Sequence, residues 1–286
     1  METAPVNFRQ QREFGDVINA TFTFISQNFK KLIKVILFYG GPFYLIYGIV
    51  LGSLQLNLFS PFRNGHLNGD DLFAFAVKYL LLIVVAVITH VFNYALVYSY
   101  IKLYNEKGQD GFEISEVWRM AWRKFFMVFG TSIVAGLLVG LGCLFLFFPG
   151  IYISIPLTLI IAVRMNEDKG LGNALDRCFY LVKNKWWVTF GLVIVAYLIS
   201  SAMSYVFMIP QYVMIFLTAF HGKSTPEFGY LMTICTAISS FFTMILTNIP
   251  LIAIAFHYFS LVEQKDNPGL LERIESIGHE ESTSEL

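Results

Sequence analysis

Long apolar runs, separated by short polar segments, occupy most of the chain between residues 32 and 262. A helix needs about 20 mainly apolar residues to cross a bilayer, and five runs reach that length. The third run, 125–165, is long enough for two crossings, and the turn-forming sequence Phe148-Pro149-Gly150 divides it. The pattern predicts an all-α fold, a polytopic transmembrane helix bundle of about six spans. The predicted spans lie at about 32–54, 74–103, 126–147, 151–165, 187–219 and 229–262.

Three of these spans leave alternatives open. The span 151–165 is short, so it either crosses the bilayer or dips into it and returns to the same side. The last two runs are longer than a bilayer requires and contain Pro210 and Pro250. They are expected to tilt, kink or project beyond the bilayer. Alternatively, 211–220 forms a separate re-entrant piece.

A helical repeat precedes three of the predicted hairpins. The segments that start at Phe14, Ile114 and Leu171 carry apolar or small residues at offsets 0, 3, 4, 7, 8, 11 and 15, with one threonine. This spacing is typical of an amphipathic helix, so such helices are predicted at about 14–29, 114–125 and 171–186, with the whole stripe turned inward. Offsets 8 and 15 are aromatic in all three copies.

Tryptophan and basic side chains gather in the same segments. Tryptophan favours the headgroup level of a membrane, and lysine and arginine favour an anionic leaflet. We therefore expect interfacial helices that bind the anionic headgroups of the inner leaflet, although helices packed only on the protein's own spans would show the same pattern. A protein partner or a homo-oligomer is a further option. The candidate membrane-interface residues are Trp118, Trp122, Trp186, Trp187, Arg119, Arg123, Lys124, Lys183 and Lys185.

The distribution of charge predicts which side of the membrane each segment faces. Of the 20 lysines and arginines, all but Arg63, Lys78 and Lys223 fall at the chain ends or in connections on one side. Cytoplasmic segments carry the excess of lysine and arginine, so both termini are expected in the cytoplasm. Residues 1–264 are then a single transmembrane domain, and 265–286 an acidic cytoplasmic tail.

Overall composition agrees with lipid as the main solvent. Hydrophobic residues make up 56% of the chain and charged residues 14%, whereas soluble domains carry about 25% charge. The formal net charge is zero, which offers no bulk attraction to nucleic acid.

One stretch, FPGIYISIPLTLIIAVRMNEDKGLGNALDRCFYLVKNKWWVTFGLVIV at 148–195, resembles the glycerophosphoryl diester phosphodiesterase membrane-domain family and related bacterial inner-membrane proteins. The resemblance rests on a Pro-Gly-Ile-Tyr turn, Pro149 to Tyr152, and on Lys185-Trp186-Trp187 at the end of an amphipathic helix. In fused members of that family the phosphodiesterase is a separate soluble barrel, for which the residues after Val262 are too few. The resemblance thus implies the membrane module without its enzyme.

One group of polar residues in the predicted spans could form a functional site at membrane depth. His90 lies one turn from Asn93 and Tyr94 in the second predicted span, and an ionisable residue there marks a candidate intramembrane polar site. The alternative is a neutral imidazole that hydrogen-bonds a neighbouring helix. No phosphate-binding loop, nucleophile elbow or metal-ligand spacing is present. No catalytic residue, cofactor or metal is therefore predicted.

Two functional hypotheses follow. The first is a non-enzymatic membrane module that organises lipid or binds a partner. The second is a transporter or a protein that handles lipids or other amphiphiles, supported by His90 and by the helix breaks that Gly40-Gly41-Pro42 and Pro250 predict.

Overall fold

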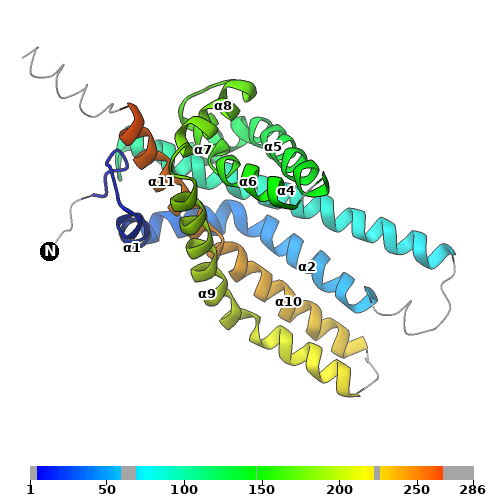
Figure 1. The fold of residues 1–286 in the computed structure, drawn as a ribbon. Coiled ribbons are helices and arrows are strands. Elements are labelled where there is room, and N and C mark those ends of the chain that lie inside the picture. The colour runs from blue at the N-terminus through cyan, green and yellow to red at the C-terminus, as the bar shows by residue number, and fades with distance from the viewer. Residues whose placement is uncertain (1–4, 59–68, 146, 222–225, 267–286) are drawn as a thin grey trace, which may run out of the picture.

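The computed structural model describes residues 5–58, 69–145, 147–221 and 226–266, which form helices joined by short turns with no strand among them (Figure 1). Within these residues, six helical stretches are long and apolar enough to cross a membrane, which confirms the predicted six-span, all-α fold. Arg63, Lys223 and the tail from residue 267 onward lie outside the described residues. The six stretches are Phe14–Leu54, Leu72–Lys107, Ile114–Phe145, Phe147–Asn166, Trp186–Leu217 and Gly229–Asp266.

The helices run in one order from the amino to the carboxyl end of the described chain. They are α1 (Phe14–Val35), the π-helical turn η1 (Ile36–Gly40), α2 (Gly41–Leu58), α4 (Gly69–Lys107), α5 (Ile114–Phe145), α6 (Phe147–Leu157), α7 (Ile160–Asn166), α8 (Leu171–Val182), α9 (Trp186–His221), α10 (Pro226–Leu246) and α11 (Asn248–Asp266).

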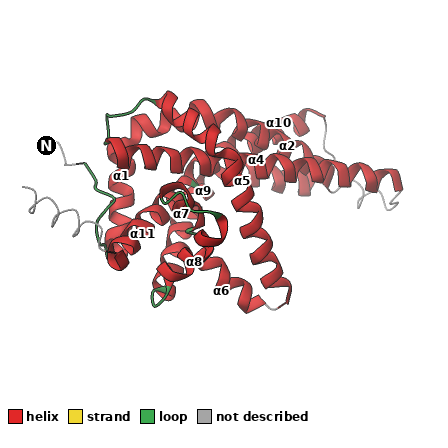
Figure 2. Ribbon diagram, turned by 90° about the horizontal axis from the view of Figure 1, so that it is seen from above, coloured by secondary structure: helices red, strands yellow, loops and turns green. Residues whose placement is uncertain are grey.

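The first helix changes direction before it joins the other spans. α1 passes through η1 into α2, and Pro42 is the second residue of α2. Proline has no N–H to donate to the carbonyl four residues earlier, so the hydrogen-bond ladder is disturbed at this point. Figure 2 shows that α1 lies across the end of the molecule from which α2, α4 and α10 extend.

The hairpin between α5 and α6 is tighter than the sequence predicted. α5 ends at Phe145 and α6 begins at Phe147, so the predicted turn residues Pro149 and Gly150 lie in the first turn of α6. Proline is tolerated there because the first N–H groups of a helix have no intrahelical acceptor. A Cβ built on Gly142 would lie 2.9 Å from the Cα of Gly150, so two glycines allow the backbones to touch.

We call the end of the molecule at which α1 lies the converging end. Three helical stretches return to it, namely α4, α6–α7 and α10–α11, and the last two of these are interrupted. The outgoing helix α9 is continuous. α6 gives way to α7 just after Pro156, and α10 gives way to α11 at Thr247, two residues before Ile249-Pro250. α9 continues through Pro210 to His221, so residues 211–220 belong to the same helix as the residues before them.

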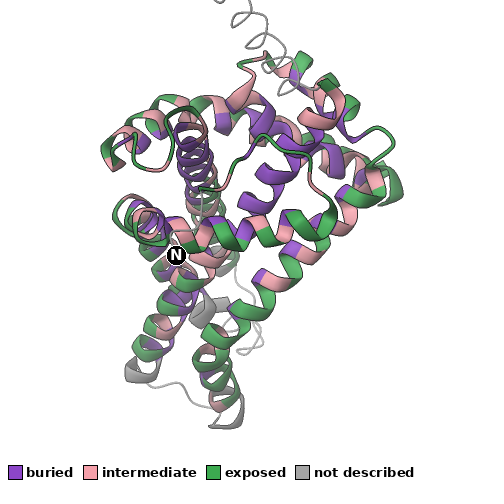
Figure 3. Ribbon diagram, turned by 90° about the vertical axis from the view of Figure 1, so that its left-hand side faces the viewer, coloured by how far each residue is buried: buried purple, intermediate pink, exposed green. Residues whose placement is uncertain are grey.

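The packed core lies where three returning segments meet, namely residues 91–104 of α4, α7 and α11. Figure 3 shows buried residues gathered at this end and exposed residues along the projecting hairpins. Phe92, Met165 and Phe256, one from each segment, are fully buried. The projecting parts expose large apolar side chains such as Leu144 and Val206, which suits helices surrounded by lipid.

Candidate functional site

The three amphipathic helices present the same offsets to the protein and to the outside. At offsets 3 and 7 every residue is at most 1% exposed. We call these residues the inner row: Val17, Thr21, Val117, Ala121, Ala174 and Cys178. At offset 8, Phe22, Trp122 and Phe179 are 39%, 56% and 39% exposed, and we call them the outer aromatic row.

The sequence prediction that offset 8 also points inward is therefore wrong. A 3.6-residue period reports which residues are apolar, but it does not say whether an apolar face meets protein or lipid. Offset 5 is exposed and polar in all three helices, as Asn19, Arg119 and Asp176, which we call the polar row. Successive residues of an α-helix point about 100° apart. Around each helix, the outer aromatic row therefore lies between the inner row and the polar row, and the order of the three rows is the same in all three helices.

The four tryptophans divide between anchored and outward positions. Trp118 stacks on Tyr39 with ring centroids 4.8 Å apart, and the indole N–H of Trp186 donates to the carbonyl of Tyr152 at 3.1 Å. Trp122 and Trp187 are the exposed pair, at 56% and 76%. Among the predicted basic residues, Lys124 is half-buried and four are exposed, namely Arg119, Arg123, Lys183 and Lys185.

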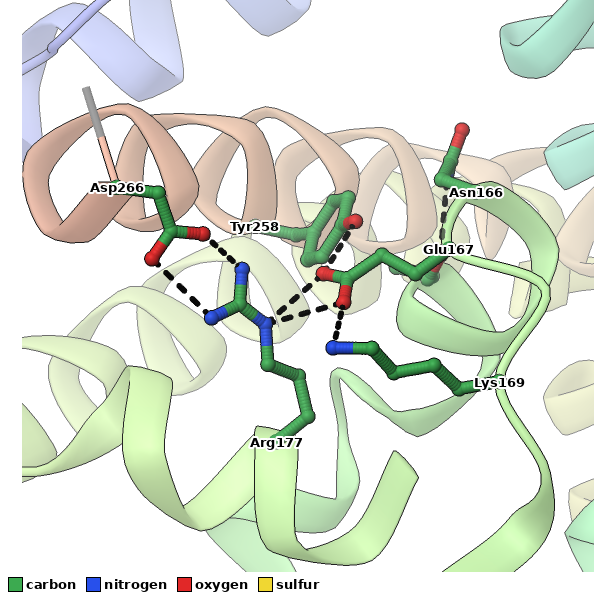
Figure 4. Close-up of polar contacts among 7 residues, drawn as sticks. Asn166, Glu167, Lys169, Arg177, Tyr258 and Asp266 are labelled. Carbon is green, nitrogen blue, oxygen red and sulfur yellow. Dashed lines mark hydrogen bonds and ion pairs between the residues drawn. The ribbon is translucent and has the colours of Figure 1, made fainter. Parts of the chain in front are cut away.

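A second feature that the sequence analysis missed is a polar junction formed by Glu167, Lys169, Arg177, Tyr258 and Asp266 (Figure 4). The Arg177 Nε donates to both carboxylate oxygens of Glu167 at 3.1 Å, and its Nη1 donates to Asp266 at 3.2 Å. The Tyr258 hydroxyl donates to Glu167 at 3.0 Å, and Lys169 pairs with Glu167 at 2.7 Å. The junction ties the α7–α8 connection to α8 and to the end of α11.

Electrostatics favour the charged form of Arg177 in this junction. Burial works against the guanidinium, but the hydrogen bonds that it donates to Asp266 and Glu167, together with the charges of these carboxylates, raise the pKa of Arg177 above its usual value. A cleft of about 450 Å³ lies beside these residues. Because the charged groups of the junction already pair with one another, it fastens helices together.

The loop after α7 makes a related contact that joins three units of the chain. The Asp168 carboxylate accepts a hydrogen bond from Lys124 of α5 at 2.8 Å and lies 3.6 Å from Lys102 of α4. The hydrogen bond from Lys124 lowers the pKa of Asp168. Lys102 also donates to the carbonyl of Met165 at 2.7 Å.

A short sequence likeness could have revealed this region. The end of α4 and the glycine after it read IKLYNEKG, residues 101–108, and the end of α7 and its connection read VRMNEDKG, residues 163–170. The matched cations are Lys102 and Arg164, and Arg164 donates to Thr131 of α5 at 2.5 Å. Two returning segments thus end in the same way, and each cation reaches a neighbouring helix.

The structure separates the three residues of the candidate intramembrane site. His90 is exposed, and its Nδ1 lies 3.0 Å from the carbonyl of Ala86 on its own helix. Asn93 is 3% exposed and accepts a hydrogen bond from the Tyr44 hydroxyl of α2. Tyr94 is half-buried and stacks on Tyr98, with centroids 6.4 Å apart. The buried polar contact at this depth is therefore between Tyr44 and Asn93.

The described residues contain no group of three or more His, Cys, Asp or Glu side chains placed to hold a metal ion. Comparisons with protein-family models, with curated proteins and with solved structures find no match to the chain.

Proposed function

We propose that the protein is a non-enzymatic membrane module that organises anionic lipid on one leaflet through three interfacial helices. The observation that carries this proposal is the shared arrangement of α1, the start of α5, and α8, in which an inner row contacts the protein and an aromatic row faces outward. Aromatic side chains beside exposed Arg123 and Lys183 suit the level of anionic headgroups. The orientation of α1 across the ends of the spans agrees with a helix in the plane of the membrane (Figure 2).

The proposal extends to location. We place the three helices and both termini on the cytoplasmic side of a bacterial inner membrane, because the basic residues gather there. The resemblance of residues 148–195 to the phosphodiesterase membrane-domain family belongs to the same proposal, as kinship with the membrane module alone.

The proposed function predicts that the outer aromatic row lies deeper in the membrane than the polar row, which spin labelling can test. In a variant lacking Cys143, Cys178 and Cys235, single nitroxide labels are placed at Phe22, Trp122 or Phe179 and, as matched controls, at Asn19, Arg119 or Asp176. In vesicles containing phosphatidylglycerol, we expect nitroxides of the first set to collide more often with oxygen, which dissolves in lipid, than with a water-soluble nickel chelate. Nitroxides of the second set should show the reverse. Equal responses from the two rows would contradict interfacial binding.

The orientation has its own test. Single cysteines at positions 63 and 223 are expected to react with a membrane-impermeant maleimide added to intact cells, whereas a cysteine at position 183 is expected to react only after lysis. Labelling of position 183 in intact cells would overturn the assigned orientation.

A second candidate, a carrier of lipids or other amphiphiles, is favoured by the breaks at Thr158–Leu159 and Thr247, because interrupted helices inside a membrane protein form many transport sites. Purified protein in vesicles that fails to move a fluorescent lipid between leaflets faster than empty vesicles would remove this candidate.

A further inference from the structure

A pocket of about 240 Å³ lies between the start of α1, the start of α9 and the end of α11. Its polar lining includes Arg12 and Glu13 before α1, Lys185 before α9, and Gln264 near the end of α11. His257, only 6% exposed, lines the pocket about two turns before Gln264 on α11. The pocket is therefore bounded by three segments that are far apart in sequence.

The lining changes from cationic to apolar along α9. Lys185 directly precedes the helix, and Val188 and Leu192 follow it on the pocket side. At about 1.5 Å per residue, Leu192 lies roughly 10 Å along the axis from Lys185. Trp187, beside Lys185, is 76% exposed, as expected of a tryptophan at headgroup level. Such a gradient matches a molecule with a charged head and an apolar chain.

The two cations of this pocket differ from Arg177 of the polar junction in making no ion pair at contact distance with any described residue. Within the described residues, neither Arg12 nor Lys185 forms an ion pair, whereas Arg177 binds two carboxylates. The Arg12 guanidinium lies over the ring of Phe256, 5.2 Å from its centroid, and donates to the carbonyls of Asn7, Phe8 and Gln10 and to the side-chain oxygen of Gln10. Neutral groups thus fix its position, while Asp16 attracts its charge and Glu13 lines the same pocket.

The inner wall of the pocket supplies a further polar group. His257 Nε2 lies 2.9 Å from the Thr189 hydroxyl, which also contacts the carbonyl of Lys185 at 3.0 Å. The other ring nitrogen, Nδ1, has no hydrogen-bond partner among the described residues. A ligand in the pocket would therefore meet two cations and the Glu13 carboxylate, with one imidazole on the inner wall.

We propose that this pocket binds one anionic phospholipid, with its phosphodiester between Arg12 and Lys185 and an acyl chain along Val188 and Leu192. The inference rests on the proposed function, because it takes the starts of α1 and α9 to lie at a leaflet surface. The proposed function needs only a surface whose basic residues together attract many headgroups. The pocket adds to that surface one site that binds a single lipid.

The test is native mass spectrometry of the delipidated full chain in detergent, titrated with phosphatidylglycerol or phosphatidylcholine. We expect one phosphatidylglycerol to bind more tightly than the rest, and phosphatidylcholine to show no such step. Lys185→Gln should weaken this first step about tenfold, since a charge-assisted hydrogen bond contributes at least that much. The control, Lys30→Gln, removes an exposed cation of α1 that does not line the pocket and should leave the step unchanged.

Val188→Trp provides a second test that keeps every charge, because it fills the apolar part of the pocket. It should also weaken the first phosphatidylglycerol step while leaving the binding of further lipids unchanged. Equal binding by wild type, Lys185→Gln and Val188→Trp would overturn the site, as would equal affinity for phosphatidylcholine. Displacement of the lipid by millimolar inorganic phosphate would assign the pocket to a soluble anion and also overturn it. The nitroxide depth measurement tests the proposed function separately, since it does not use this pocket.

Discussion

Gly48 on α2 faces Ala237 on α10 so closely that a Cβ built on Gly48 would lie 2.7 Å from the Ala237 Cα. One turn further along, a Cβ on Gly52 would lie 2.9 Å from the Cα of Thr233. Two glycines four residues apart thus allow the α2 and α10 backbones to meet, as small residues do between membrane helices.

The first prediction concerns this contact. Gly48→Ala should lower the free energy of unfolding by about 1–3 kcal/mol, because the added methyl group meets backbone that has no room to move. Gly136→Ala is the matched control, since a Cβ at Gly136 has nothing within 4 Å. Thermal or SDS unfolding of the protein in detergent measures both. A stable Gly48→Ala variant would show that α2 and α10 are further apart in solution.

The second prediction separates the two apolar rows of α5. Ala121→Leu should destabilise the protein by about 1–3 kcal/mol, because Ala121 is 0% exposed and the larger side chain overpacks the interface. Its neighbour Trp122 is 56% exposed, so Trp122→Leu should change the free energy of unfolding in detergent by no more than about 0.5 kcal/mol. The same unfolding assay serves both variants, and equal losses would refute the assignment of rows.

The third prediction concerns the polar junction. Arg177→Gln should loosen the end of α11, because it removes the cation that binds both Glu167 and Asp266. Hydrogen–deuterium exchange should therefore rise in residues 258–266 and in α8, and remain unchanged in the α2–α10 contact. Lys183→Gln, which changes an exposed residue directly after α8, is the control. Unchanged exchange in α11 would mean that the junction contributes nothing to its docking.

The fourth prediction is a pH dependence. The hydrogen bond from Lys124 lowers the pKa of Asp168 in the folded state, so this carboxylate stabilises the protein above its unfolded-state pKa and loses that effect as the pH falls through the lowered value. Asp168→Asn should thus cost a fraction of a kcal/mol at pH 7, since the side chain is 64% exposed, and progressively less as the pH falls below the ordinary aspartate pKa of 3.8. Asparagine is the suitable replacement, because it tolerates the positive φ of 46° at this position.

Unfolding curves of wild type and Asp168→Asn at several pH values provide the measurement. A difference between the two proteins that stays constant down to about pH 2 would contradict the role of the charge. Lys124→Met should reproduce the loss at pH 7, because it removes the donor of the same hydrogen bond.

The six spans could be predicted from the sequence because run length and hydropathy depend on local composition alone. The positions of helix ends near prolines were harder. Pro149 looked like a turn residue, yet a proline in the first turn of a helix is compatible with helix geometry, and the structure places it inside α6. A proline shows only that one backbone N–H is missing. It does not fix the residue at which a helix ends.

The contacts of the candidate sites depend on three-dimensional packing. Glu167, Arg177 and Asp266 are brought together only by the docking of α8 and α11, so no spacing along the chain indicates them. His90 attracted attention as an ionisable residue at membrane depth, yet its helix turns it outward and Asn93 inward. The sequence analysis did not single out Gly48 and Gly52, and only the structure shows that these two glycines meet α10.

The repeated helix has a mechanical consequence. α1, the start of α5, and α8 all lie around the converging end of the molecule, each ahead of a hairpin that leaves from that end and comes back to it (Figures 1 and 3). All three copies therefore lie at the same end of the spans. If the three helices insert at a leaflet, the area that they occupy is added to one monolayer only. Each molecule would then enlarge one monolayer relative to the other by a constant area. A high density of the protein would therefore bend the bilayer toward one side.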